Sequence, residues 1–152
     1  MSEIKVVRGA SEISDADALI SLVQKQMACH GGNGEYERIK RAVLNALKLE
    51  SRAFFLIWES SDNEIGAFCF CNICSGLESG ADYIWVNEFY VDEKYRRRGI
   101  AGNMLKFLDS FSKEIGAVYI AGITEAENEI AQSMYRKSGF GLSRPVWFDK
   151  TL

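Results

Sequence analysis

One stretch of the chain, residues 90–105, restricts the fold more than any other. It starts as an apolar strand, passes through a charged turn and runs into an amphipathic helix. The link into the helix, residues 96–102, combines three arginines, Arg96, Arg97 and Arg98, with the small residues Gly99, Ala101 and Gly102 on either side of Ile100. Small residues let a ligand come close to the backbone, and the first amides of a helix have no acceptor within it. Since these amides, the positive helix end and the arginines stand together, the stretch predicts a phosphate or pyrophosphate site.

The arginine cluster has two other interpretations. It could be a solvated turn, or it could contact nucleic acid. The chain carries a formal net charge of −3, whereas nucleic-acid binders usually show a basic excess, and one short cluster is a small footprint for such a ligand. We therefore expect a small phosphate-bearing ligand and no nucleic-acid partner.

The same stretch resembles the acyl-CoA loop of the GNAT N-acetyltransferase superfamily. The pattern of that family is Gln/Arg-x-x-Gly-x-Gly/Ala, and this chain reads Arg96-x-x-Gly99-x-Ala101. A second segment is similar to the family's Asn-x-x-Ala-x-x-Leu-Tyr-x-x-x-Gly-Phe. It reads Asn128-Glu-Ile-Ala131-Gln-Ser-Met-Tyr135-Arg-Lys-Ser-Gly139-Phe140. The two motifs lie at the distance expected in the family, with one helix and one strand between them, and the resemblance covers residues 84–141.

The order of the apolar segments predicts one domain over residues 1–152, of the α/β (α+β) class. We expect a GNAT-like mixed, mostly antiparallel twisted sheet of about six to seven strands, flanked by about four helices. Strands are expected at residues 4–8, 52–59, 64–74, 83–91 and 117–123, with one or two more in the tail, residues 140–152. Helices are expected at residues 14–29, 35–49, 99–116 and 128–139. A helix joins strands 83–91 and 117–123, so these two should be parallel, and the resemblance implies that they splay apart at the centre of the sheet.

Three local features complete the expected fold. Ser14 is predicted as the N-cap of the first helix. Gly66 is predicted as a β-bulge. Pro145 should lie at a sheet edge or a bulge, because it cannot donate a ladder hydrogen bond.

The resemblance implies which residues bind acetyl-CoA. A crevice opens where two parallel strands part, and there the backbone of Phe89, Tyr90 and Val91 would hold the pantetheine arm and the thioester. An amide near Tyr90 or Val91 would act as the oxyanion donor. Residues 96–102 would hold the pyrophosphate, although Arg97 stands where many relatives have glycine.

Asn128, Ala131 and Tyr135 lie on one face of the last helix, because they are three and four residues apart. By the resemblance, Asn128 would bond the pantetheine amides, Ala131 would leave clearance and Tyr135 would reach the thioester sulfur. A phenol is protonated at pH 7 and can donate to the leaving thiolate. The alternative is that Tyr135 is a core aromatic whose hydroxyl is bonded elsewhere.

Glu88 is the second predicted catalytic residue. It is a charged residue within an otherwise mostly apolar strand and shares a face with Tyr90. It could deprotonate the incoming ammonium, directly or through water, or it could anchor it. The alternatives are an exposed strand position or a structural hydrogen bond. Asn87 lies on the opposite face and is the weaker prediction.

A group of acidic residues follows the strand at 117–123: Glu125, Glu127 and Glu129. Close to the crevice, they would attract a cationic acceptor. The other interpretation is a solvated helix N-terminus, where carboxylates are favourable anyway.

The spacing of Cys69, Cys71 and Cys74 has two interpretations, a metal or redox site and a set of buried thiols. Cys69-x-Cys71-x-x-Cys74 has no second ligand pair, and Cys69 and Cys71 share one strand face. We expect buried thiols in a reducing cytoplasm. The single histidine, His30, precedes two glycines at a helix end, where a cation suits the dipole; a catalytic role is the alternative.

Together these inferences predict an acetyl-CoA-dependent N-acetyltransferase. No cysteine stands in a matched catalytic position, so the amine should attack the thioester directly. The acceptor is expected to be a small cationic amine such as a polyamine, an aminoglycoside or an amino acid. An N-terminal or lysine acetyltransferase of proteins is the alternative within catalysis, and a non-catalytic acyl-CoA sensor is the alternative outside it.

Localisation and assembly are less constrained. No apolar run is long enough to span a membrane, and residues 1–5 lack the apolar region of a signal peptide. We therefore expect a cytoplasmic protein without a membrane partner. The identity of the acceptor, the acyl-chain preference and the pathway stay open, and so does the choice between a monomer and a homodimer.

Overall fold

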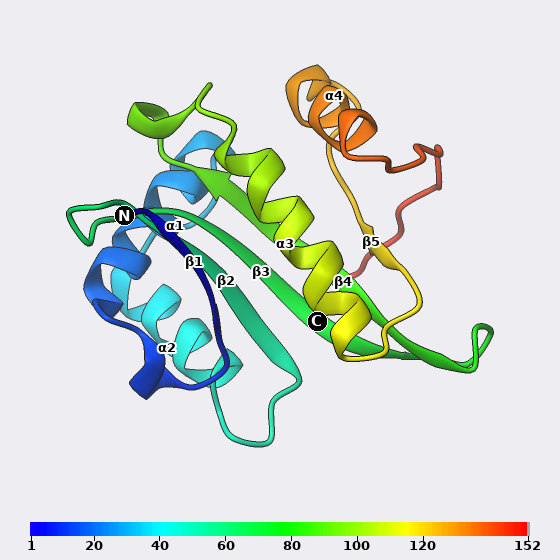
Figure 1. Cartoon of the computed structure of the whole chain (residues 1–152), viewed down its shortest axis with the longest axis horizontal. Helices are drawn as coiled ribbons and strands as arrows, with labels where there is room; N and C mark the ends of the chain where they lie inside the picture. The colour runs from blue at the N-terminus through cyan, green and yellow to red at the C-terminus, as the bar shows by residue number, and fades with distance from the viewer. Residues whose placement is uncertain (152) are drawn as a thin grey trace.

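The computed structural model describes residues 1–151 and has a five-stranded sheet at its centre, with the strand order β1-β2-β3-β4-β5 (Figure 1). The strands are β1 (Glu3–Val7), β2 (Ala53–Glu59), β3 (Ile65–Gly76), β4 (Ala81–Val91) and β5 (Ile120–Gly122). The helices are α1 (Ala16–Cys29), α2 (Tyr36–Ala46), α3 (Ile100–Glu114) and α4 (Glu129–Lys137). Two short 3-10 helices are η1 (Ala10–Glu12) and η2 (Glu93–Tyr95). The predicted class and element order are confirmed, with fewer strands than expected.

The sheet is antiparallel from β1 to β4 and parallel between β4 and β5. The parallel pairing is short and joins Ile84, Trp85 and Val86 of β4 to Ile120, Ala121 and Gly122 of β5. β4 then continues to Val91 without β5 beside it. The two strands therefore part after Val86, as predicted, and one edge of the second half of β4 is left free.

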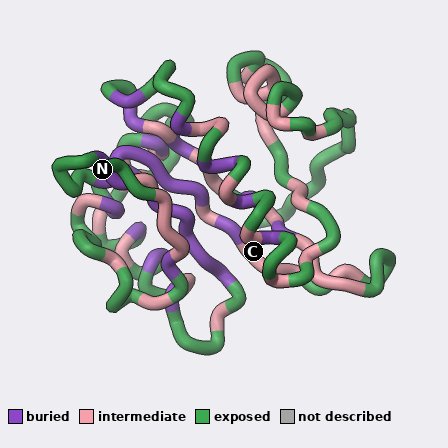
Figure 2. Tube along the Cα trace, viewed as in Figure 1, coloured by how far each residue is buried: buried purple, intermediate pink, exposed green. Residues whose placement is uncertain are grey.

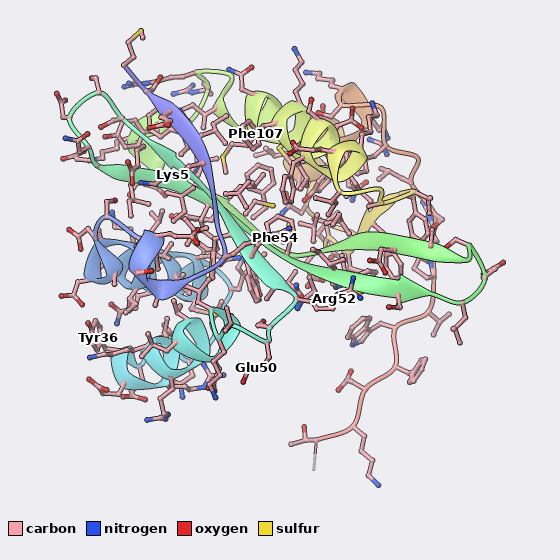
Figure 3. All side chains as sticks on the ribbon, turned by 60° about the horizontal axis from the view of Figure 1, so that its bottom comes forward. Lys5, Tyr36, Glu50, Arg52, Phe54 and Phe107 are labelled. Atoms are coloured by element: carbon pink, nitrogen blue, oxygen red, sulfur yellow. The ribbon has the colours of Figure 1, made fainter. Side chains whose placement is uncertain are left out.

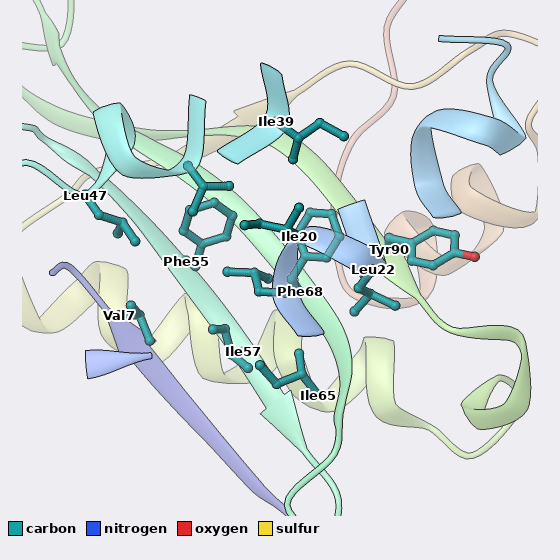
Figure 4. Packing of buried hydrophobic residues seen from close by; sticks show 12 residues of the cluster. Val7, Ile20, Leu22, Ile39, Leu47, Phe55, Ile57, Ile65, Phe68 and Tyr90 are labelled. Carbon is teal, nitrogen blue, oxygen red and sulfur yellow. The ribbon is translucent and has the colours of Figure 1, made fainter. Parts of the chain in front are cut away.

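Helices cover both faces of the sheet. α1 and α2 pack on one face around a buried cluster that includes Ile20, Leu22, Ile39, Phe55 and Phe68 (Figure 4). α3 packs on the other face, in a cluster that includes Phe54, Leu56, Met104, Leu105 and Leu108. Each such side chain contributes about 1.5–3 kcal/mol when fully buried. Buried residues follow the central strands, whereas α4 has none (Figure 2).

α3 forms because apolar side chains recur at helical spacing along it. Ile100, Met104 and Leu108 are all buried against the sheet. Gly99 precedes the helix with φ 75°, and Gly116 follows it with φ 79°. Glycine adopts this left-handed conformation without a Cβ clash, so the two glycines define the ends of the helix near the predicted bounds.

A β-bulge at Gly66 confirms a second prediction. Trp58 pairs with Ala67 and Glu59 pairs with Ile65, so Gly66 is the extra residue. A Cβ at Gly66 would come within 2.4 Å of the Tyr95 ring. Only glycine leaves room there for the ring that packs beneath the turn before α3.

The sequence analysis did not predict the bulge at Asn87, which changes the face of the sheet to which each later side chain of β4 points. Phe70 pairs with Glu88 and Cys71 pairs with Val86, so Asn87 has no partner in the register. Before the bulge, Ile84 and Val86 belong to the α3-side cluster, and after it Phe89 and Val91 do. The bulge therefore directs Glu88 and Tyr90 to the face that α1 covers.

The prediction of strands in the tail is wrong. Residues 140–151 form no strand and no helix, which leaves five strands instead of six to seven. β5 has only three residues and offers a short edge, while Pro145 lacks the amide that a ladder requires. Among residues 1–151 the tail has no sheet partner.

Other expected boundaries shift for local reasons. The N-cap of α1 is Asp15 and not Ser14, because the Asp15 carboxylate accepts from the Ala18 amide at 2.9 Å, whereas the Ser14 hydroxyl donates to Glu59 at 2.5 Å. α2 begins after Glu35, whose carboxylate caps it, and ends before Leu47. The strand expected at residues 117–123 shrinks to β5, because the Ala117 amide still bonds the end of α3 at Ser112.

Candidate active site

The loop before α3 presents a row of free backbone amides. Within residues 1–151, the amides of residues 97–102 have no acceptor, whereas the flanking Arg96 and Asn103 amides bond Glu93 and Gly99 at 3.2 and 3.0 Å. A Cβ built at Gly99 or Gly102 would meet no atom within 4 Å. Free amides beside open space at a helix N-terminus are groups from which a phosphate can accept hydrogen bonds, so the loop is compatible with the phosphate site that the sequence predicts.

The three exposed arginines of this loop are held differently. Arg96 is fixed, because its Nε donates to the Val91 carbonyl at 2.9 Å and its guanidinium lies 5.3 Å from the centre of the Tyr90 ring. Arg98 lies over the Tyr95 ring at 5.5 Å. Arg97 has φ 60°, a left-handed conformation that costs a non-glycine residue about 1–2 kcal/mol. The loop keeps a glycine-like backbone where arginine replaces the family's glycine.

The free half of β4 is held from the opposite face by two adjacent residues of α1. The Lys25 ammonium pairs with the Asp92 carboxylate at 2.5 Å, and the Gln26 side-chain amide donates to the Glu88 carboxylate. These contacts replace the support that β5 gives to the first half of β4. They position the strand edge that the resemblance assigns to the pantetheine arm.

Gln26 is a site residue that the sequence analysis missed. Its side chain is only 2% exposed, and its Oε1 has no hydrogen-bond partner among the described residues. A signal was present, because Gln26 is a polar residue one helical turn after Leu22 in the apolar stripe of α1. Its one hydrogen bond goes to Glu88, so it orients a carboxylate that is itself half-buried.

Asp92 links α1 to the turn before α3. Burial opposes ionisation of its carboxyl, but hydrogen bonds from Lys25 and from the Lys94 amide outweigh burial and lower its pKa below the usual 3.8. The carboxylate is therefore ionised at neutral pH. It fixes the start of η2 and, through it, the position of the amide-rich loop.

α4 carries the second predicted motif. The Asn128 side-chain oxygen caps the helix by accepting from the Ala131 amide at 3.0 Å, and its amide nitrogen can still donate to a ligand. Gly139, with φ 88°, follows the helix and ends it as predicted. Tyr135 packs edge-on against Phe140, with ring centres 5.5 Å apart.

Tyr135 lies in the α3-side cluster together with Cys69 and Cys71. Burial raises the pKa of Tyr135 well above its usual range, and the two cysteines add to this. No hydrogen bond of its hydroxyl is recorded within residues 1–151. The phenol is thus neutral at physiological pH and has a proton to donate.

Glu88 and Tyr135 belong to opposite faces of the sheet. Glu88 is on the α1 side with Tyr90, and Tyr135 is on the α3 side. β4 and β5 are not paired beyond Val86 and Gly122, so the sheet is open between its two faces there. A hollow adjoins this region between α3, β5 and the end of α4, and Leu105, Ile120 and Phe140 are among the residues that line it. Another hollow lies near the C-terminal end of α3, around Arg8 and Arg52.

The face of β4 and β5 beside α1 carries aromatic residues that the sequence analysis did not single out. The Tyr83 and Tyr119 rings stack with centres 4.6 Å apart and an 8° angle between planes. Trp85 alternates with Tyr83 and lies on the same face. This aromatic surface stands next to Glu88, on the side from which an acceptor would enter.

Other predicted features are placed as follows. Glu125, Glu127 and Glu129 are exposed in the segment after β5. Cys69 and Cys71 are buried with sulfurs 3.5 Å apart, as expected of neighbours on one face. His30 is the exposed C-cap of α1.

Residues 1–151 contain neither a cluster of metal-ligating side chains nor a helix that could span a membrane. No group of three or more histidine, cysteine, aspartate or glutamate side chains in this part of the chain is arranged to hold a metal ion. None of its helices combines the length and the apolar character needed to cross a membrane.

Comparison with known proteins agrees with the two motifs. The sequence model of the acetyltransferase (GNAT) family matches residues 19–140. GCN5-related N-acetyltransferase 6, chloroplastic, from Arabidopsis thaliana is 32% identical over 111 residues, which make up 70% of this chain and 38% of that protein. The chain thus spans well under half the length of this curated relative.

Solved structures share the fold at low sequence identity. An aminoglycoside acetyltransferase from an uncultured soil metagenomic sample, in complex with sisomicin, has a TM-score of 0.80 and 16% identity, over 99% of this chain and 96% of that one. AAC(6')-Iy in complex with the bisubstrate analogue CoA-S-monomethyl-acetylneamine has a TM-score of 0.74 and 17% identity, over 100% and 99% of the two chains. At these identities, the likeness establishes the fold alone.

Proposed function

The chain belongs to the acetyltransferase (GNAT) family, and from this premise we propose that it is an acetyl-CoA-dependent N-acetyltransferase acting on a primary amine of a small cationic molecule. One observation carries the proposal: a row of free amides at the start of α3 lies at the same end of β4 as the strand edge that β5 leaves open. The first feature suits the pyrophosphate of CoA. The second offers backbone groups of Phe89, Tyr90 and Val91 to an extended pantetheine arm.

The proposed chemistry is a direct transfer. The amine nitrogen forms a bond to the thioester carbon, the carbon–sulfur bond breaks, and the products are an N-acetyl amine and the free thiol of CoA. Glu88 accepts the proton that the ammonium must lose, and Tyr135 donates a proton to the departing sulfur. A backbone amide near Tyr90 or Val91 stabilises the oxyanion.

The arrangement of the two faces suits this division of roles. Tyr135 and the amide-rich loop lie on the α3 side, where CoA would bind, and Glu88 lies on the α1 side, where the amine would enter. The reactants would then meet in the gap between β4 and β5. Holding them together there supplies much of the rate enhancement in such a reaction.

The acceptor class is argued from charge and shape. Glu88 and the three exposed glutamates after β5 favour a cation, and the stacked Tyr83 and Tyr119 offer a flat surface to its body. The bisubstrate complex of AAC(6')-Iy joins CoA to an aminoglycoside fragment on the same fold. A peptide or protein acceptor is the alternative, and a non-catalytic acyl-CoA sensor is the second alternative.

The test measures thiol release from acetyl-CoA over polyamines, aminoglycosides, amino acids and short peptides, with acetyl-CoA binding measured by calorimetry. We expect binding, and turnover with at least one small cationic amine. Turnover confined to peptides would favour the protein acetyltransferase. Binding without thiol release for every acceptor would favour the sensor, and absence of binding would remove the whole proposal.

A further inference from the structure

The aromatic surface formed by Tyr83, Trp85 and Tyr119 belongs to neither of the two buried clusters that residues 1–151 form. β3 and β4 extend as a hairpin beyond α1 and α2, so these helices leave that part of the face uncovered (Figure 3). Tyr83 and Trp85 are half-buried, and Tyr119 is 47% exposed. A large aromatic side chain can bury about 150–250 Å², so the three rings offer apolar area to a ligand.

The aromatic surface begins where β4 and β5 part. Trp85 pairs with Ala121, directly before the last pair of the parallel register. The stacked rings of Tyr83 and Tyr119 lie two residues farther from the gap, which is about 7 Å along a strand. A molecule lying on these rings would therefore have one end at the gap, where the proposed function brings the amine and the thioester together.

This face carries one negative charge beside the rings. Glu88 is the only carboxylate that the described residues of β3, β4 and β5 place on it. Asp82 lies on the opposite face, where it pairs with Arg52, and the neighbouring Asn72 and Asn87 side chains are neutral and bond each other at 2.5 Å. One carboxylate balances one ammonium, whereas a second ammonium over the rings would lose water without gaining a partner.

We propose that the acceptor is a monocationic amine with an aromatic ring, which lies on Tyr83, Trp85 and Tyr119 and directs its nitrogen toward Glu88. This inference rests on the proposed function and narrows its substrate class. Aromatic rings attract one another beyond the area that they bury, so the surface selects a flat ring over a saturated ring of the same size. The exposed Glu125 and Glu127 follow β5 and would attract any cation without selecting its body.

Thiol release from acetyl-CoA over a matched set of amines tests the substrate class. Phenethylamine is compared with cyclohexylethylamine, which has the same spacer and ring size but no flat face, and with putrescine and sisomicin, which carry several ammonium groups. We expect kcat/KM for phenethylamine to exceed that for cyclohexylethylamine about tenfold and those for the two polycations by more. Turnover that is equal or faster with the saturated amine or with the polycations would overturn the inference and leave the proposed function standing.

Two variants locate the ring site. Trp85→Leu and Tyr119→Leu should each raise KM for phenethylamine about fivefold or more, while the Kd for acetyl-CoA measured by calorimetry stays unchanged. Phe107→Leu is the matched control, because it removes another half-buried ring, from α3 on the opposite side of the sheet (Figure 3), and it should keep the preference for phenethylamine. A preference that survives both surface variants, or that is lost equally in the control, would overturn the inference.

Binding separates the failure of this inference from the failure of the proposed function. Calorimetry measures the Kd of phenethylamine for the full chain with and without CoA. If no amine releases thiol, the proposed function is wrong, but phenethylamine binding that Trp85→Leu weakens would still support an aromatic-amine site on this face. If phenethylamine neither binds nor reacts, the inference is wrong as well.

Discussion

Tyr135 has surroundings that favour a neutral phenol over a phenolate. It is packed against Phe140 and the Cys69–Cys71 pair, and burial raises its pKa. A group with a raised pKa loses its proton only at higher pH. The proton that the proposed reaction requires of Tyr135 is therefore present at neutral pH.

Tyr135→Phe should lower kcat by about 100-fold, because a positioned general acid contributes on the order of 10²–10⁴. The Kd for acetyl-CoA should change less than about twofold, since the ring and its packing stay. Steady-state kinetics and calorimetry measure the two quantities. In wild type, kcat should show no decline from ionisation of this tyrosine up to about pH 10; unchanged turnover in the variant would take the acid role away from Tyr135.

Gln26 is the residue whose burial is hardest to explain by stability alone. Its unpaired Oε1 costs about 1–3 kcal/mol, yet the other end of the amide bonds Glu88. A buried polar group with one unsatisfied atom is often retained at a functional site. We infer that Gln26 orients the carboxylate proposed as the base.

Gln26→Leu should leave the melting temperature unchanged or raised, while kcat/KM for the acceptor falls about tenfold, the value of one hydrogen bond to a charged group. Gln24→Leu is the matched control, since Gln24 is on the same helix and bonds the Gly34 carbonyl instead. A loss of activity that merely follows a loss of stability would make Gln26 structural.

At the scale of elements, the glycines before and after α3 have the same backbone conformation but different surroundings. Gly99 and Gly116 have nearly the same φ, 75° and 79°, and neither has an atom within 4 Å of a built Cβ. Only Gly99 faces the free amides. A substitution at either glycine should therefore cause the same backbone strain, but only a substitution at Gly99 would lie beside the predicted ligand.

Gly99→Val should weaken acetyl-CoA binding at least tenfold, because a branched side chain would occupy the space where the phosphate must approach. Gly116→Val should cost the helix similar stability, about 1–2 kcal/mol, and leave binding unchanged. Calorimetry and thermal unfolding of both variants provide the comparison. Equal Kd values for the two would mean that the loop before α3 does not hold the cofactor.

Local patterns predicted α3 and α4 well, because each helix depends on residues close in sequence, whereas the splaying of β4 and β5 was expected from the family resemblance. The bulge at Asn87 was not predicted, since it arises from the register between β3 and β4, two strands paired over a long range. The Gln26–Glu88 contact was not predicted either, because it joins residues that are far apart in the sequence. The tail was wrongly predicted as strand, because strand propensity says nothing about whether an edge is within reach.

At the scale of the whole molecule, two buried carboxylates tie separate elements together. Glu59 joins β2 to Lys5 of β1 at 2.5 Å, and Asp92 joins the end of β4 to Lys25 of α1 at 2.5 Å. Burial opposes ionisation of both, but hydrogen bonds from their partners outweigh it and lower each pKa. Such groups stabilise the fold when ionised and stop doing so in acid.

Asp92→Asn should lower the free energy of unfolding by about 2 kcal/mol at pH 7, the value of a hydrogen bond to a charged group. Since the pKa of Asp92 is lower in the folded state than the usual 3.8, wild type holds this advantage at all pH values above 3.8 and loses it as the pH falls through the folded pKa. Urea unfolding should therefore show the same difference in free energy at pH 7, 5 and 4 and a smaller difference at pH 3. Asp109→Asn breaks the exposed pair with Lys113 and should change the free energy of unfolding by less than about 0.5 kcal/mol at every pH. If the difference caused by Asp92→Asn persists unchanged to pH 3, ionisation of the Asp92 carboxyl does not hold α1 to β4.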